Sequence, residues 1–175
     1  VVECYIDNKL WRKTSKYDPM FAYILNKDVE HYAFQVYRPL AEEKVNKFRD
    51  HNVEGHLFGL EQLPKNGDTL IITKSCKDVL VLASRGYNAI CPFSEASYVH
   101  LLAILPKLFE RFNHIYIMYD PDPAGIGYSQ KVIEEYGGEL KNILIPESLK
   151  KDPADNVVAG LEQEFFDFLK EEVAV

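Results

Sequence analysis

Acidic side chains gather at three places in the second half of the sequence. Asp120 and Asp122 are two residues apart, Asp78 comes three residues after Ser75, and Asp152 and Asp155 lie close together near the C-terminus. Residues two apart in an extended turn point the same way, so Asp120 and Asp122 can share one cation. Two carboxylates that close repel each other unless a proton or a metal lies between them. Oxygen-only ligands favour Mg²⁺ or Mn²⁺.

Each of these residues could also have a purely structural role. Asp120-Pro-Asp122-Pro is typical of a turn followed by a helix N-cap. Asp78 can complete a capping box with Ser75, and Asp152 can cap the helix that begins at Pro153. These structural roles stay open for single residues. It is less probable that all these carboxylates converge on one edge of a sheet by chance.

The elements that must position these carboxylates alternate regularly. Short apolar runs at residues 69–73, 87–91, 114–118 and 140–145 are typical of buried strands. Helices are expected at about 76–85, 97–112 with a break at Pro106, 124–136, from 152, and 161–172. Such alternation predicts an α/β domain, a sheet of about four parallel strands flanked by helices. Ligands of such sheets lie beyond the carboxyl ends of the strands, where these carboxylates are expected.

The first part of the chain is predicted to be β-rich. Residues 32–37 alternate as a strand does, residues 21–25 are a second candidate, and residues 3–11 are a weaker third. Turn-forming residues cluster at 64–68. We therefore expect a small β-rich (α+β) lobe over residues 1–64 and the α/β domain over residues 65–175.

Composition restricts the class of protein. The net charge of −7 falls entirely after Lys65, since ten basic and ten acidic residues precede that point and ten basic and seventeen acidic residues follow it. Cys4, Cys76 and Cys91 have no metal-ligand spacing and are expected to be reduced thiols. No apolar run approaches the roughly 20 residues of a membrane span, and the start is not a signal peptide. We expect a fragment of a longer cytoplasmic protein.

The combined motifs resemble a known family. Ile72-Thr-Lys-Ser-Cys-Lys-Asp78, then Asp120-x-Asp122-x-x-Gly125, then Lys151-Asp152-Pro153 are similar to the Toprim domain of phage-type and bacterial-type replicative DNA primases. Relatives usually have Glu-Gly where this chain has Lys74-Ser75.

The resemblance extends upstream of these motifs. Tyr37-Arg38-Pro39, the basic segment 47–49 and the segment 56–60 resemble the basic subdomain that precedes Toprim in primases. Because Toprim also occurs in topoisomerases and nucleases, this upstream similarity is what selects a primase. The resemblance covers most of residues 30–158, and residues 1–30 show no match.

The resemblance implies the catalytic core of a primase, a nucleotidyltransferase that makes RNA primers on a single-stranded DNA template from ribonucleoside triphosphates. Mg²⁺ or Mn²⁺ would be held by Asp120, Asp122 and Asp152. The implied contacts to template and nucleotide phosphates are Arg38, Lys44, Lys47, Arg49 and Lys77. The implied supporting residues are Asp78, Gly125, Lys151 and Asp155. Zinc-binding and helicase domains are expected outside this fragment, which would act in a nucleoid or a phage replication complex.

Lys74 is the serious departure from the family pattern, because a protonated lysine cannot bind a metal. One hypothesis is that Glu95, just past the second expected strand, supplies the missing carboxylate as a catalytic residue. Lys74 would then pair with Asp120 or a phosphate. Another hypothesis is a degenerate Toprim module that binds DNA or a replication partner without catalysis. A phosphoryl-transfer domain of receiver or haloacid-dehalogenase type ranks last, because it needs an aspartate where this chain has Thr73-Lys74.

Overall fold

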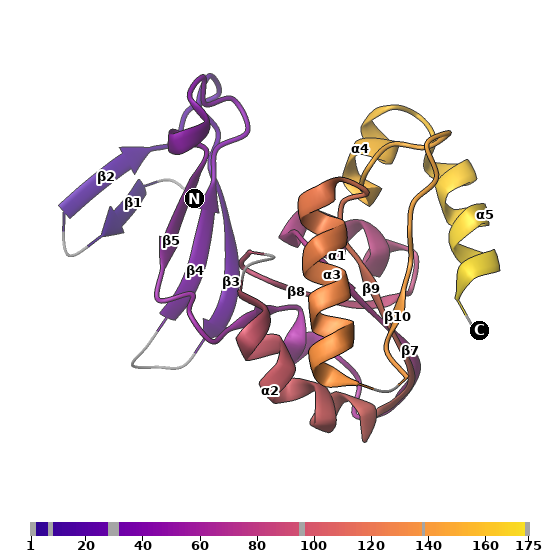
Figure 1. Cartoon of the computed structure of the whole chain (residues 1–175). Helices are drawn as coiled ribbons and strands as arrows, with labels where there is room; N and C mark the ends of the chain where they lie inside the picture. The colour runs from indigo at the N-terminus through magenta and orange to yellow at the C-terminus, as the bar shows by residue number, and fades with distance from the viewer. Residues whose placement is uncertain (1–2, 7–8, 28–31, 95–96, 138, 174–175) are drawn as a thin grey trace. The chain divides into compact units, whose positions relative to one another are not determined.

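The computed structural model describes residues 3–6, 9–27, 32–94, 97–137 and 139–173, which form two compact units, residues 1–56 and 57–175. The first unit holds an antiparallel hairpin and a three-stranded antiparallel sheet of order β3-β4-β5 (Figure 1). Its elements are β1 (Glu3–Ile6), β2 (Lys9–Lys13), β3 (Phe21–Lys27), β4 (Tyr32–Tyr37), the 3-10 helix η1 (Lys44–Asn46) and β5 (Phe48–His51). The predicted β-rich character is confirmed, although residues 3–13 form two strands rather than one.

The second unit is built on a five-stranded sheet of order β10-β9-β7-β8-β6. Its strands are β6 (Leu57–Phe58), β7 (Gly67–Thr73), β8 (Asn88–Pro92), β9 (Phe112–Met118) and β10 (Lys141–Asn142). The last four are parallel, and β6 joins the edge of β8 in the antiparallel direction. The predicted α/β sheet with four parallel strands is thus confirmed, with one short strand added.

Helices cover both faces of this sheet (Figure 1). They are η2 (Leu60–Gln62), α1 (Cys76–Ser84), α2 (Tyr98–Phe109), α3 (Pro123–Tyr136), α4 (Pro153–Val158) and α5 (Glu162–Glu172). The buried leucines of α2 pack with Ile72, Ile90 and Ile117, which the alternation of strand residues places on one face. On the other side, α1 contacts α4 and α4 contacts α5. No helix in the described ranges is long and apolar enough to cross a membrane.

The expected break at Pro106 is wrong, because α2 continues through this residue. Proline removes one backbone hydrogen bond from a helix interior. Leu101, Leu105 and Leu108 are fully buried on the two sides of the proline. Packing of these side chains holds the helix together across the lost hydrogen bond, so α2 ends only at Phe109.

The two units divide between His56 and Leu57, eight residues before the boundary that the turn-forming cluster suggested. Leu57 pairs with Pro92 of β8, and its side chain is buried in the core of the second unit. Gly59 follows with a positive φ of 89°, where a Cβ would meet the carbonyl oxygen of Ala89. This segment is therefore the edge of the α/β sheet.

Candidate active site

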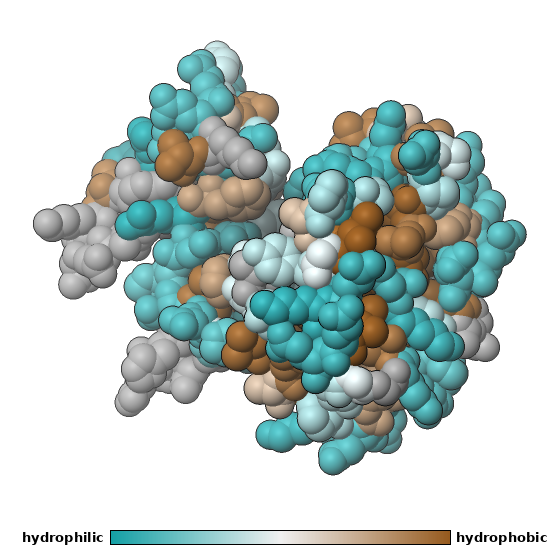
Figure 2. All heavy atoms as spheres, viewed as in Figure 1, coloured by the Kyte–Doolittle hydropathy of each residue, from teal (hydrophilic) through white to brown (hydrophobic). Residues whose placement is uncertain are grey.

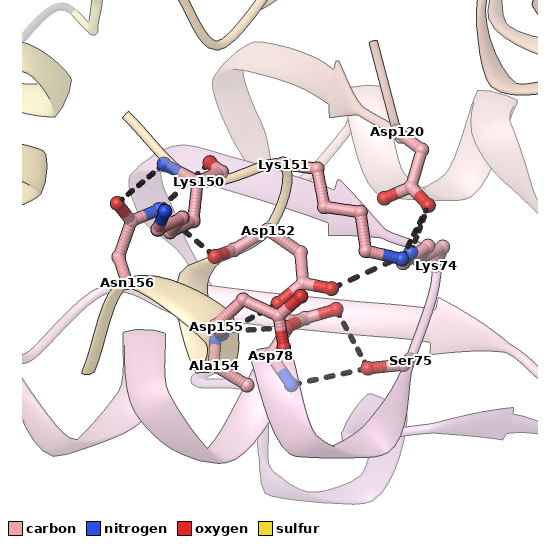
Figure 3. Close-up of polar contacts among 10 residues, drawn as sticks. All are labelled: Lys74, Ser75, Asp78, Asp120, Lys150, Lys151, Asp152, Ala154, Asp155 and Asn156. Atoms are coloured by element: carbon pink, nitrogen blue, oxygen red, sulfur yellow. Dashed lines mark hydrogen bonds and ion pairs between the residues drawn. The ribbon is translucent and has the colours of Figure 1, made fainter. Parts of the chain in front are cut away.

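The carboxyl ends of β7 and β9 lie side by side, because Thr73 pairs in register with Met118. This register brings Lys74 next to Asp120. The Lys74 ammonium forms an ion pair with Oδ2 of Asp120, and its Nζ lies 3.5 Å from Oδ2 of Asp152 (Figure 3). One lysine therefore joins carboxylates that follow two different strands.

Asp120 is a buried carboxylate beside Lys74, with 8% of its surface exposed. Its Oδ2 atom also lies 3.4 Å from Nζ of Lys151. Its Oδ1 atom is buried and has no hydrogen-bond partner among the residues that the structure describes, and neither has the buried Oγ1 of Thr73. An unsatisfied buried carboxylate oxygen is costly, so Oδ1 of Asp120 is able to accept a further partner.

Asp78 is buried at the start of α1 and is held from both sides. The Ser75 hydroxyl donates to its Oδ2 at 2.6 Å, and the backbone N–H of Ala154 donates to its Oδ1 at 3.1 Å. Burial, followed by the negative charge of Asp152, raises the pKa of Asp78 to about 6. The predicted cap is present: the Ser75 hydroxyl oxygen accepts the backbone N–H of Asp78, and the Ser75 hydroxyl donates a hydrogen bond to the Asp78 carboxylate.

Asp152 and Asp155 belong to the start of α4. Oδ1 of Asp152 accepts the backbone N–H of Asp155 at 2.7 Å, which leaves Oδ2 facing Lys74. The loop before this cap is held by Asn156, which is fully buried. Its side chain binds both backbone groups of Lys150 and the carbonyl of Asp152, each at 2.9 Å. Sequence analysis missed Asn156, because an asparagine in a short polar helix carries no local signal.

Asp122 and Gly125 form the start of α3, directly after Asp120. Oδ1 of Asp122 accepts the backbone N–H of Gly125 at 2.8 Å, as the N-cap of this helix. A Cβ at Gly125 would overlap the Asp120 carbonyl oxygen and lie 2.9 Å from the Asp120 nitrogen. The glycine lets the helix begin against the Asp120 backbone. Asp122 itself is exposed.

Lys74 is protonated in this environment. Burial by itself lowers the pKa of a lysine, whereas the hydrogen bond and the charge of Asp120 raise it, as does the charge of Asp152. The net result is a pKa above the ordinary value. The lysine thus compensates part of the negative charge that the converging carboxylates create.

The other sequence-predicted site residues lie elsewhere or cannot be placed. Glu95 is outside the described residues, so its proposed role stays a prediction. Lys77 is half-buried on α1. Lys44, Lys47 and Arg49 belong to η1, to the residue before β5 and to β5, all in the first unit.

Arg38 is buried in the first unit. Its Nε and Nη2 atoms donate to the two carboxylate oxygens of Asp18 at 3.0 and 2.8 Å, and its Nη1 atom donates to the carbonyl of Asn46 at 3.2 Å. The guanidinium therefore ties together loops of the small unit. These contacts favour a structural role over the predicted contact to phosphates.

The described residues fit a divalent cation whose coordination is completed by substrate oxygens. Oδ1 of Asp120 is an orphaned, buried, hard oxygen ligand. No group of three or more His, Cys, Asp or Glu side chains that could hold a metal occurs in the ranges described. Mg²⁺ commonly uses only one or two carboxylates and takes its other ligands from phosphates and water.

The chain matches no known sequence family, whereas its structure is similar to several solved structures. No family model matches the chain, and no curated protein matches its sequence. The primase fragment of the bacteriophage T7 primase-helicase superimposes with a TM-score of 0.65 at 19% identity, covering 89% of this chain and 65% of that one.

Two DnaG structures are also similar. The DnaG catalytic core has a TM-score of 0.62 at 20% identity, and 95% of this chain matches 56% of it. A DnaG primase catalytic domain bound to single-stranded DNA has a TM-score of 0.61 at 19% identity, with coverages of 97% and 56%. The chain thus spans between about half and two thirds of these structures. The chain is thus similar in fold to these DNA primase catalytic fragments.

Proposed function

We propose that this chain is the catalytic core of a DNA primase, which joins ribonucleotides into RNA primers on single-stranded DNA. The observation that carries the proposal is the meeting of Lys74, Asp120 and Asp152 at the carboxyl edge of the sheet, on a primase-type fold. In parallel α/β sheets this edge is where substrates bind. Nucleotidyl transfer needs charge compensation of a triphosphate at such a site.

Asp120 and Asp122 are the residues that would hold Mg²⁺ or Mn²⁺. When bound, the ion would neutralise triphosphate charge and favour ionisation of the attacking 3′-hydroxyl. Asp120 offers its orphaned Oδ1 for this purpose, while its Oδ2 is held by Lys74. Lys74 stays charged and keeps Asp120 and Asp152 oriented, and it presents a positive charge to phosphates at the same edge.

The small unit would bind the template through Lys44, Lys47 and Arg49, by charge and without reading sequence. A DnaG catalytic domain of the same fold is bound to single-stranded DNA, which supports a template role for this architecture. Zinc-binding and helicase domains are proposed partners outside these 175 residues. One structural neighbour carries zinc-binding and RNA polymerase domains, and another is a primase-helicase fragment.

A primer-synthesis assay with the intact protein tests the proposal. The enzyme is incubated with single-stranded DNA of mixed sequence, all four ribonucleotides (one radiolabelled) and Mg²⁺ or Mn²⁺. We expect short RNA products that Asp120→Asn reduces by at least about a hundredfold, as is typical of a lost metal ligand. Absence of products with every template and metal ion would contradict the proposal.

Glu95 remains the proposed substitute for the family glutamate. We expect Glu95→Gln to lower primer synthesis by roughly a hundredfold or more, if it acts as ligand or base. The alternative role is to favour the helix dipole at the start of α2, where a glutamine costs only stability. Unchanged primer synthesis by Glu95→Gln would decide for that alternative.

A second candidate is a module that binds DNA or a replication partner without catalysis. It is favoured by the ion pair of Lys74 with Asp120, because the lysine already compensates the carboxylate charge. This candidate predicts tight binding of single-stranded DNA, no primers, and no effect of Asp120→Asn on binding. Primer synthesis that depends on Asp120 rejects it.

A further inference from the structure

The ammonium group of Lys74 lies where an ion shared by two carboxylates would lie. It pairs with Oδ2 of Asp120, and its Nζ is 3.5 Å from Oδ2 of Asp152 (Figure 3). The side chains of Lys74, Asp120 and Asp152 are only 18%, 10% and 8% exposed. A magnesium ion between the same oxygens would need ligand distances of about 2.1 Å, which would bring it against the ammonium. The lysine and such an ion are therefore mutually exclusive.

The carboxylate oxygens on the Asp152 side of Lys74 are already bonded. Oδ1 of Asp152 accepts the backbone N–H of Asp155 at 2.7 Å, and its Oδ2 faces the ammonium. The nearby buried carboxylate of Asp78 accepts one hydrogen bond on each of its oxygens. Each of these oxygens thus has a partner that a metal ion would have to displace.

The charges between Asp120 and Asp152 also balance without a metal ion. Nζ of Lys151 lies 3.4 Å from Oδ2 of Asp120, so two ammonium groups share this oxygen. The two lysines offset the two carboxylates, and the four charges sum to zero. A divalent ion added at this position would leave an excess of positive charge in a largely buried place, where like charges repel strongly.

The other oxygen of Asp120 is in a different situation. This Oδ1 atom is buried and has no hydrogen-bond partner in the described part of the chain. Asp122 is exposed and uses its Oδ1 atom as the cap of α3. A magnesium ion commonly takes one or two carboxylates and completes its coordination with phosphates and water. The carboxylates on this side therefore suit one divalent ion.

We propose that Lys74 takes the place of a second metal ion, so that the site holds a single divalent cation on Asp120 and Asp122. Sites with two metal ions use one ion for the attacking oxygen and one for the leaving oxygen. Here the ammonium supplies one of these positive charges, and Asp152 orients the ammonium instead of binding metal. The inference rests on the proposed function for the reaction, and it adds the number of metal ions and the role of Asp152.

The test is a count of bound Mn²⁺ by electron paramagnetic resonance, using the whole chain without nucleotide or template. Figure 2 shows hydrophilic residues over much of the surface in view, and many acidic side chains are exposed. Ions bound loosely to such side chains are subtracted with Asp120→Asn/Asp122→Asn as the baseline. We expect one ion above this baseline in wild type and two in Lys74→Ala, because two carboxylates without a cation between them attract one.

Further variants identify where the second ion binds. Lys151→Ala removes the same charge from beside Asp120 but keeps Lys74, and should still bind one ion. Asp152→Asn should also bind one ion, and Lys74→Ala/Asp152→Asn should return from two ions to one. Circular dichroism monitors the folding of each variant. If Lys74→Ala does not fold, Lys74→Gln removes the charge with a longer side chain and carries the same expectation of two ions.

The inference would be overturned by two ions in wild type, by no ion in wild type, or by a single ion in a folded Lys74→Ala or Lys74→Gln chain. A second ion that persists after Asp152→Asn would overturn it as well. These counts are independent of primer synthesis. A chain that gives the expected counts but makes no primer contradicts the proposed function only, whereas a primase whose Lys74 variants stay at one ion contradicts this inference only.

Discussion

Lys74 and Asp120 define the chemistry of the sheet edge at the scale of single residues. The ammonium is shared between Asp120 and Asp152, and its pKa is raised by these carboxylates against the effect of burial. A cation supplied by the chain itself therefore holds two carboxylates together. Oδ1 of Asp120 is buried without a hydrogen-bond partner in the described part of the chain, which is why we propose it as a ligand of the cation.

Replacing both Asp120 and Asp122 with asparagine should abolish the weak Mn²⁺ binding of the isolated chain. The fold should persist, because asparagine keeps the size of each side chain and can still cap α3. Isothermal calorimetry with Mn²⁺ measures the effect. Asp68→Asn is the matched control, because Asp68 lies at the opposite end of β7, where it accepts a hydrogen bond from Asn113. Equal Mn²⁺ affinity of wild type and double variant would reject this site.

Asp78 should make stability depend on pH. Its pKa is raised from 3.8 to about 6, so the folded state favours the protonated carboxyl. The contribution to stability is fully present below about pH 4 and is lost as the pH rises through about 6. About two pKa units correspond to roughly 3 kcal/mol. The free energy of unfolding of wild type, relative to Asp78→Asn, should therefore fall by about that amount between pH 4 and pH 8.

Urea denaturation followed by circular dichroism at several pH values measures this difference. Asp167→Asn is the control of opposite sign. The pKa of Asp167 is lowered, first by a hydrogen bond from Gln163, so its small contribution is lost as the pH falls. A difference between wild type and Asp78→Asn that is constant from pH 4 to pH 8 would show that Asp78 is ionised alike in both states.

At the scale of elements, the start of α3 against the Asp120 backbone is the tightest constraint on the site. Gly125→Ala should destabilise the protein by about 1–3 kcal/mol, because the added Cβ overlaps the Asp120 carbonyl. At Gly127, two residues along the same helix, an added Cβ meets no described atom within 4 Å apart from the neighbouring helix backbone, so Gly127→Ala should stabilise by about 0.5–1 kcal/mol. Thermal unfolding compares the two variants, and shifts of the same sign would refute the packing argument.

At the scale of the whole molecule, the chain consists of two units that join at residues 56 and 57. The five-stranded sheet includes β6, so the α/β unit is complete only from Leu57. The small unit has its own sheet and its own apolar cluster around Met20 and Val36.

This division predicts different behaviour of two fragments. A fragment of residues 57–175 should unfold cooperatively, whereas a fragment of residues 65–175 should melt at least roughly 10 °C lower. The shorter fragment lacks Leu57, Leu60 and Leu63, which pack against the main core, and burying one leucine contributes about 2 kcal/mol. Circular dichroism during heating makes the comparison. Equal melting temperatures would place the boundary of the folded α/β unit at residue 64 instead.

The sequence by itself determined the parallel sheet and most of its helices. Strand and helix periods are local, and caps such as Ser75 and Asp152 are written in adjacent residues. The β-rich first unit followed from the same alternation. The break expected at Pro106 does not occur, because the effect of this proline depends on three leucines that pack against strands far away in sequence.

Only the tertiary structure decided how the site is assembled. The register of β7 against β9 places Lys74 on Asp120, and no local pattern specifies that register. The same holds for Asn156, whose side chain fixes the loop that carries Asp152, and for Leu57, which belongs to the second unit through its pairing with β8. These contacts join residues distant in sequence, so they arise from core packing and strand pairing, whereas the types of the residues were already visible in the chain.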